Sequence, residues 1–511
     1  INFTNPTAPL FGLPDETRTF TLAGTNTDAN TLAALLTDNG TGALSLAKTG
    51  PGAWTLTAAN TYTGPTTISG GTLVLANANA LPGGVGTTGG TSALTLSGGV
   101  VGLATANFTR SLGLGIDQVQ FAGSGGFAAY GADRLVNLGG ASAALVWNGT
   151  ANFLTTGSSL LLGAAGANKT VTFQNALDLN GAARTVNVAD GSADVDGVLS
   201  GAITATGGGG LIKAGSGTLL LTGANTYSGP TAVNEGVLRL GSAAALGNPN
   251  SAVTIADVFS TALDLAGLNV QIGSLAGGGL FGGGVSLGSG TLTTGSDGTS
   301  TTFGGIISGL GGLTKIGAGT LTLSGTSTYA GATNVTAGTL LVNGGLSGSV
   351  TTVSSGATLG GSGTVPDVTV SGGTLAPGAN GIGTLSTGSL SLNASSTSRF
   401  ELTLGNSTAG GGLNDLIAIT GNLTLDGLLQ VVELGGALNA SDTYTLFDYS
   451  GTLTDNGLQL DSAFLTAHPG AMILIDTINT QVLLAVPEPG VFTSLLGGMS
   501  LLLGFRRRRQ A

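Results

Sequence analysis

One 28-residue pattern occurs three times in this chain of 511 residues, at 48–75, 213–240 and 315–342, and the copies align without a gap. Each copy starts with a lysine, has a tyrosine in its middle, and has glycines at the same four positions. Internal repetition of this kind is typical of chains that stack one supersecondary unit on the next. The repeats therefore favour an elongating architecture over a single compact core.

The repeats read as short strands separated by turns. Apolar residues alternate with threonine in 320–323 and 339–342, which is the pattern of half-buried strands, and the glycines suit the turns between them. The ends of successive leucine-rich strands lie 19 residues apart in all three copies: Leu56 and Leu75, Leu221 and Leu240, Leu323 and Val342. A constant step of this size predicts one coil of an all-β, right-handed parallel β-helix, or β-solenoid. A series of β-sandwiches, which also alternates, remains an alternative.

Composition excludes several chemistries. The chain has no cysteine and one histidine, His468, so it cannot form a disulfide framework, a cysteine nucleophile or a thiolate zinc site. Residues 1–485 hold 10 basic and 24 acidic side chains, and this negative charge argues against nucleic acid as a partner. No cofactor is expected.

Composition also suggests domain boundaries. The proline-containing segment 1–42 is expected to be an N-terminal lead-in or cap, and 43–395 the β-helix. Charged and aromatic residues increase over 396–485, which suggests a C-terminal β capping module that protects the last coil.

The last segment, 486–511, differs from the rest of the chain. An apolar stretch at 491–505 precedes four arginines, and we expect it to form a short hydrophobic C-terminal helix. Fifteen helical residues span about 22 Å, less than the ~30 Å hydrocarbon core, so crossing a membrane would need thinning or snorkelling. The positive-inside bias would keep the arginines cytoplasmic. A buried helix with a solvated basic end is the alternative. The chain starts at Ile1 without an export signal, which we expect to be cleaved or left out.

Few residues suggest a chemical site. His468 lies in a turn without a triad motif, and Asp190–Gly197 only partly fits a calcium loop. The segment 411–416 resembles a single calcium-binding nonapeptide but is better explained as the start of a strand. The aligned Lys48, Lys213 and Lys315 are expected at turn corners, with carbohydrate binding as the alternative. No catalytic or metal site is predicted.

The repeat resembles the autotransporter-associated β-strand repeat, through the Lys-x-Gly-x-Gly, Asn-Thr-Tyr-x-Gly and Gly-x-Leu-x-Leu elements of its copies. That resemblance extends more loosely over most of 43–435 and implies a parallel β-helix of a bacterial surface or secreted protein. An autotransporter ends in an outer-membrane barrel of alternating strands, a pattern that we do not recognise after the repeats, so we expect a passenger carried by another export route.

The tail resembles the PEP-CTERM sorting signal, which pairs a Pro-Glu-Pro motif with an apolar stretch and basic residues. The resemblance implies Sec export in a Gram-negative bacterium, a transient inner-membrane anchor, and recognition by an exosortase-type enzyme. The corresponding residues are Pro487, Glu488, Pro489, Arg506, Arg507, Arg508 and Arg509.

These observations predict a stiff structural or adhesion protein of the cell surface or extracellular matrix, with exopolysaccharide or other surface glycans as partners. A β-helix polysaccharide lyase or glycoside hydrolase is the alternative, and Asp194 and Asp196 are its candidate carboxylate pair because residues two apart can share a strand face. A third hypothesis is β-assembly into fibres through exposed strand ends.

Overall fold

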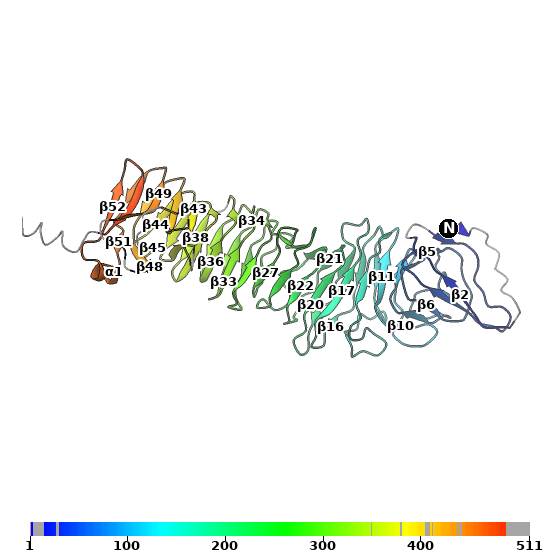
Figure 1. Ribbon diagram of the computed structural model, residues 1–511. Coiled ribbons are helices and arrows are strands. Elements are labelled where there is room, and N and C mark those ends of the chain that lie inside the picture. The colour runs from blue at the N-terminus through cyan, green and yellow to red at the C-terminus, as the bar shows by residue number, and fades with distance from the viewer. Residues whose placement is uncertain are drawn as a thin grey trace, which may run out of the picture. The chain divides into compact units, whose positions relative to one another are not determined.

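The computed structural model describes residues 2–3, 15–26, 30–348, 350–378, 381–403, 409–410, 412–436, 438 and 442–486. Short strands make up nearly all of its regular structure, and the described residues contain a single helix, α1 (Ser462–Ala467). The chain divides into two compact units, Ile1–Gly290 and Thr291–Ala511, and each is described by itself. In Figure 1 successive strands lie side by side in the order of the chain within each unit.

Unit 1 consists of parallel ladders in which each strand pairs with the strand one coil later. One ladder contains β2 (Arg18–Leu22), β4 (Leu44–Lys48), β6 (Thr66–Ile68), β8 (Leu94–Leu96) and β10 (Val119–Phe121). A longer one contains β1 (Asn2–Phe3), β3 (Asn30–Leu32), β5 (Ala53–Leu56), β7 (Thr72–Leu75), β9 (Val100–Leu103), β11 (Gly125–Ala129), β14 (Leu160–Leu162), β17 (Arg184–Val188), β20 (Leu211–Ala214), β22 (Thr231–Val233), β24 (Val253–Ile255) and β27 (Leu275–Gly277).

Two further ladders and one more strand complete unit 1. The first ladder contains β12 (Arg134–Val136), β15 (Val171–Phe173), β18 (Gly197–Leu199), β21 (Thr218–Leu221), β23 (Val237–Leu240), β25 (Ala262–Asp264) and β28 (Gly284–Ser286). The second contains β13 (Leu145–Val146), β16 (Leu177–Asp178) and β19 (Ile203–Thr204), and the remaining strand is β26 (Val270–Ile272).

Unit 2 has three ladders. The first contains β29 (Leu292–Thr294), β32 (Leu313–Lys315), β35 (Thr333–Val335), β38 (Thr351–Ser354), β41 (Val368–Ser371), β44 (Leu390–Leu392), β47 (Leu423–Leu425) and β50 (Leu453–Asp455). The second contains β30 (Thr301–Phe303), β33 (Thr320–Leu323), β36 (Gly338–Val342), β39 (Ala357–Gly361), β42 (Thr374–Pro377), β45 (Thr397–Thr403), β48 (Leu428–Leu434) and β51 (Gln459–Leu460).

The third ladder of unit 2 changes direction at its end. It contains β34 (Thr326–Ser327), β37 (Gly345–Leu346), β40 (Thr364–Val365), β43 (Thr384–Thr387), β46 (Leu416–Ile419) and β49 (Thr443–Tyr449), all parallel. The antiparallel β53 (Gln481–Ala485) then pairs with β49 on one side and with β52 (Met472–Asp476) on the other. The strand β31 (Ile307–Ser308) also belongs to this unit.

The strand register confirms the predicted coil. Leu56 pairs with Leu75, Leu221 with Leu240, and Leu323 with Val342, so the 19-residue step in the sequence is the step from one coil to the next. These coil-to-coil pairings are parallel, whereas sandwiches would need antiparallel ones. The fold is therefore a parallel β-helix, and the sandwich alternative is wrong.

The interior follows from the alternation of side chains along each strand. In β33, for example, Leu321 and Leu323 are buried while Thr320 and Thr322 are partly exposed. Because the register is constant, Leu321 stacks in line with Leu340 and Leu359 of the following coils. A column of aliphatic side chains thus runs through the stacked coils.

The C-terminal part differs from the sequence prediction in one respect. The helix α1 was not anticipated, because six residues with one buried side chain, Phe464, are too few to show a helical period. The hydrophobic helix expected at 491–505 lies outside the described residues. The boundaries expected near residues 42, 395 and 485 stay predictions, and parallel pairing continues from β42 through β45 to β48 across residue 396.

Candidate functional site

A buried lysine starts each of the three repeats: Lys48 on β4, Lys213 on β20 and Lys315 on β32. Each Nζ donates to two carbonyl oxygens of the turn that follows it and to a third 22 residues further along. For Lys213 the third acceptor is Glu235 O, at 2.8 Å. Since an ammonium group has three donor hydrogens, each lysine is saturated by the backbone of two consecutive coils. Burial lowers the pKa of Lys213 to about 8.

The glycine columns explain how these turns approach so closely. At Gly71, φ is +61°, and an added Cβ would lie 2.2 Å from Gly52 O and 2.7 Å from Lys48 Nζ. A larger residue would therefore be strained in its backbone and would collide with the neighbouring turn. The repeated glycines thus let the turns of consecutive coils approach closely, and the repeated lysine binds the carbonyl oxygens of both turns.

The tyrosine of each repeat is also buried and hydrogen-bonded within the fold. Tyr62, Tyr227 and Tyr329 are buried, and each hydroxyl lies 2.6 Å from the Oγ1 of the threonine four residues later. Burial raises the pKa of Tyr62 and Tyr329 to about 12, so both stay neutral at ordinary pH. These hydroxyls act as structural hydrogen-bonding groups.

A third polar column precedes the tyrosine by two residues. Asn60 accepts from Leu36 N at 2.9 Å and donates to Ala80 O at 2.8 Å, which joins the preceding coil to the following one. Asn225 makes the equivalent bonds to Ile203 N and Ala245 O. In the third repeat Ser327 accepts from Ile307 N at 3.2 Å. The repeat lysines and asparagines are thus turn-forming residues, and the alternative that the lysines bind carbohydrate is wrong because they are buried.

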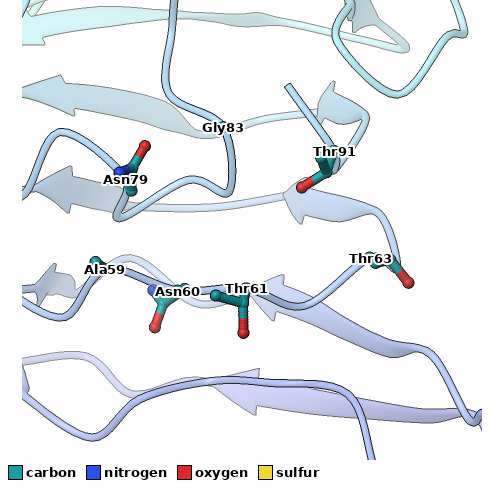
Figure 2. A pocket seen from close by; sticks show the side chains of 7 residues that line it. All are labelled: Ala59, Asn60, Thr61, Thr63, Asn79, Gly83 and Thr91. Carbon is teal, nitrogen blue, oxygen red and sulfur yellow. The ribbon is translucent and has the colours of Figure 1, made fainter. Parts of the chain in front are cut away.

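An open groove of about 390 Å³, lined by uncharged residues, lies beside the first repeat. Its lower side is the segment that carries Ala59, Asn60, Thr61 and Thr63, and the loop with Gly83 lies above it, between Asn79 and Thr91 (Figure 2). Neutral side chains, and no charged one, line it. No sequence motif indicates this groove, because its two sides are up to 32 residues apart in the chain.

The carboxylates considered for catalysis or calcium do not form one site. Asp196 is buried and accepts from Gly191 N and Thr218 N at 2.8 and 2.9 Å, and burial raises its pKa. Asp194 is exposed and pairs with Arg239 at 2.7 Å. The expectation that they share a face is therefore wrong, because one points into the fold and the other into solvent. Within the described ranges, no three acidic or histidine side chains gather into a metal-binding group.

His468 has a structural position at the end of α1. Its Nε2 lies 2.8 Å from Glu433 Oε1, and its ring packs on Phe464 with 4.6 Å between centroids. Glu433 also accepts from Leu438 N. The histidine thus links the helix to β48, and its partners here provide no nucleophile.

A buried carboxylate that sequence reasoning missed lies at the start of β46. Asp415 accepts from Gly383 N at 2.8 Å and from Glu401 N at 2.6 Å, and burial raises its pKa to about 7. Glu401, also buried, pairs with Arg399 at 2.9 Å. The sequence signal for this carboxylate is the Asn414-Asp415 pair directly before a strand. The described residues 412–416 lead into β46, in agreement with the prediction that 411–416 is the start of a strand.

The predicted sorting residues lie outside the described residues: Pro487, Glu488, Pro489, Arg506, Arg507, Arg508 and Arg509. Among the residues that the structure does describe, no helix has the length and apolarity needed to cross a membrane.

Stacked parallel coils whose turns are closed by buried lysine, tyrosine and glycine make up a parallel β-helix. Residues 46–75, 211–240 and 313–342 each match the family model of the passenger-associated-transport repeat. The three predicted copies are therefore confirmed, each starting two residues earlier than the sequence alignment placed it.

Two curated proteins are similar to part of the chain. The adhesin BmaC autotransporter of Brucella suis biovar 1 (strain 1330) is 50% identical over 95 residues, which is 18% of this chain and 3% of that protein. An extracellular serine protease of Serratia marcescens is 52% identical over 80 residues, 16% of this chain and 8% of that protein. The chain thus spans less than a tenth of either relative.

Proposed function

We propose that this chain is an exported structural or adhesion protein of a bacterial cell surface or extracellular matrix. The observation that carries the proposal is the use of the repeated polar groups inside the fold. The buried lysines and tyrosines and the asparagine column bind their own backbone or neighbouring threonines, so the repeats extend the β-helix. Its similarity to an autotransporter adhesin and to an extracellular protein supports export.

The proposed mechanism is mechanical. Main-chain ladders and aliphatic columns stiffen each unit, and its Thr, Ser, Gly and Asn surface offers weak, repeated contacts to surface glycans or exopolysaccharide. In this proposal the protein is not an enzyme. The structural roles of Asp196 and His468 support that part.

The sorting route is the second part of the proposal. Pro487–Pro489, the apolar stretch 491–505 and Arg506–Arg509 would anchor the chain transiently in the inner membrane of a Gram-negative cell and present it to an exosortase-type enzyme. Its support is the order of these three elements in the sequence.

Location in the native cell tests this proposal. We expect the full chain at the surface or in the matrix, and a variant without residues 486–511 to be lost from that fraction. Surface retention of the shortened chain would contradict the sorting route, and a cytoplasmic location of the full chain would contradict export.

A polysaccharide assay tests the structural role. The lyase and hydrolase alternative predicts product release from uronate polysaccharides that Asp194→Ala or Asp196→Ala abolishes. We expect no release from the unaltered protein, and release that depends on either residue would replace the structural proposal with the enzymatic one.

A further inference from the structure

The groove beside the first repeat depends on a connection that the other repeats do not share. Residues 76–93 join β7 to β8. The equivalent connection of the second repeat, 241–252 between β23 and β24, is shorter, and so is the segment 343–350 between β36 and β38, which includes β37. This longer loop supplies Asn79, Gly83 and Thr91 to the groove. The first repeat thus has an added feature beyond what coil stacking needs.

A fully buried arginine, Arg110, holds this loop in place through hydrogen bonds to its carbonyl groups. Arg110 donates from Nε and Nη2 to Gly84 O at 3.0 and 2.5 Å, from Nη1 to Ser92 O at 2.7 Å, and from Nη2 to Pro82 O at 3.3 Å. Ser92 Oγ adds a bond to Gly64 O at 2.8 Å. Since charge-assisted bonds to buried carbonyls are strong, the groove is preformed, which reduces the ordering cost of binding.

Some polar groups of the groove are hydrogen-bonded within the fold, and others are available to a ligand. Asn60 is satisfied by Leu36 N and Ala80 O, and Thr63 Oγ1 donates to Asp38 at 2.7 Å. Thr61, Asn79 and Thr91 are exposed, and their side chains make no hydrogen bond to any residue that the structure describes. Two hydroxyls and a carboxamide are therefore available to a ligand as both donors and acceptors.

This set of groups matches an uncharged, hydroxyl-rich ligand. The lining has no charged side chain to pair with an ionic group, and the net charge of -11 disfavours polyanions. The volume of about 390 Å³ is in the range of small-molecule sites. We infer that the groove bounded by Ala59, Thr61, Asn79 and Thr91 binds an uncharged oligosaccharide, an inference that rests on the proposed adhesive role.

The two copies of Ala-Asn-Thr provide a matched test. Ala59→Trp fills the groove, whereas Ala224→Trp places the same side chain at the equivalent exposed position of the second repeat. Binding of the full chain to glucose oligomers, N-acetylglucosamine oligomers and oligogalacturonate is followed by saturation-transfer NMR and calorimetry. We expect millimolar or tighter binding of a neutral oligomer, weakened at least tenfold by Ala59→Trp and by Asn79→Ala and unchanged by Ala224→Trp.

Three outcomes would overturn the inference. They are no binding of either neutral oligomer at millimolar concentration, preference for oligogalacturonate, or equal loss in the Ala59→Trp and Ala224→Trp variants. Circular dichroism and thermal unfolding of each variant check that it is folded, so that a loss of binding can be attributed to the groove. Surface retention is measured separately, so loss of surface location contradicts the proposed function, while a surface protein with a non-binding groove contradicts this inference alone.

Discussion

At the scale of single residues, the repeat lysines solve a problem that coil stacking creates. Tight turns that approach each other leave carbonyl groups shielded from water, and buried carbonyls need donors. Lys213 supplies donors to three of them with one side chain. The ammonium group also enters a region of low polarity, so the arrangement is stabilising only because every hydrogen is used.

Replacing Lys213 by methionine should therefore destabilise unit 1. The three carbonyls lose their donor, and each unsatisfied buried group costs about 1–3 kcal/mol, so we expect a loss of at least ~2 kcal/mol. Denaturant unfolding measures the change, and exposed Lys169→Met is the control, expected within about 0.5 kcal/mol of the unaltered protein. Equal stability of both variants would contradict the capping role.

Asp415 gives unit 2 a pH dependence of defined sign. Burial raises its pKa from 3.8 to about 7. Between pH 3.8 and about 7 the carboxyl is therefore protonated in the folded state and ionised in the unfolded state. Its contribution to stability is fully present below about pH 3.8 and is lost as the pH rises through about 7. Asp415→Asn should flatten the dependence of the unfolding free energy between pH 4 and 7, followed by urea titration at each pH. An equally steep pH dependence in the Asp415→Asn variant would contradict this role of Asp415.

At the scale of elements, the loop 76–93 shows how an irregular connection becomes rigid. Backbone that leaves the ladder loses its regular hydrogen bonds, and Arg110 replaces them with bonds to three carbonyl oxygens. The clamp comes from 18 to 28 residues further along the chain, so it forms only when the next coils have stacked.

We expect Arg110→Met to loosen this loop while the coils persist. Hydrogen exchange and limited proteolysis within 82–92 should accelerate at least tenfold, because the carbonyls lose their charged donor. Arg134→Met, which removes a bond to Ala104 O, is the control and should leave 82–92 unchanged. Equal protection of the loop in all three proteins would show that other contacts hold it.

The antiparallel pair β52–β53 covers the edge of β49, and the fibre hypothesis can be tested there. Leu484 is buried between these strands, so Leu484→Asp should detach β53 and expose the edge of β49. We expect concentration-dependent self-association of this variant in light scattering and none for Leu474→Asp, whose side chain is exposed. Self-association of the unaltered chain would instead favour fibres as its native state.

At the scale of the whole molecule, a β-helix transmits stability only between neighbouring coils. In unit 2, Leu340 packs in line between Leu321 and Leu359. Each coil buries its residues against the one before and the one after it. A local defect should therefore remain local.

Leu340→Ala tests this expectation. The cavity should cost about 2–5 kcal/mol and raise hydrogen exchange in residues 313–361. Residues 44–103 in unit 1 should keep their protection, as measured by peptide-resolved mass spectrometry. Uniform loss of protection over both ranges would show that the chain unfolds as one cooperative body.

The period of the coil and the faces of its strands could be predicted from the sequence. Alternation along a strand decides which side chains point inward, because neighbouring residues face opposite sides. The 19-residue step can be read from the three aligned copies, and the pairing of Leu56 with Leu75 confirms it. The turn role of the lysines followed from the same alignment. These features depend on residues close in the chain.

The tertiary structure decided which polar groups are buried and where a ligand can enter. Asp415 accepts hydrogen bonds from Gly383 and Glu401, and the groove needs Ala59 and Thr91 on opposite sides, with Arg110 bonded to the loop. These partners lie 14 to 32 residues apart in the chain. Burial and the closing of a groove depend on how separate coils pack, and no local pattern records that packing.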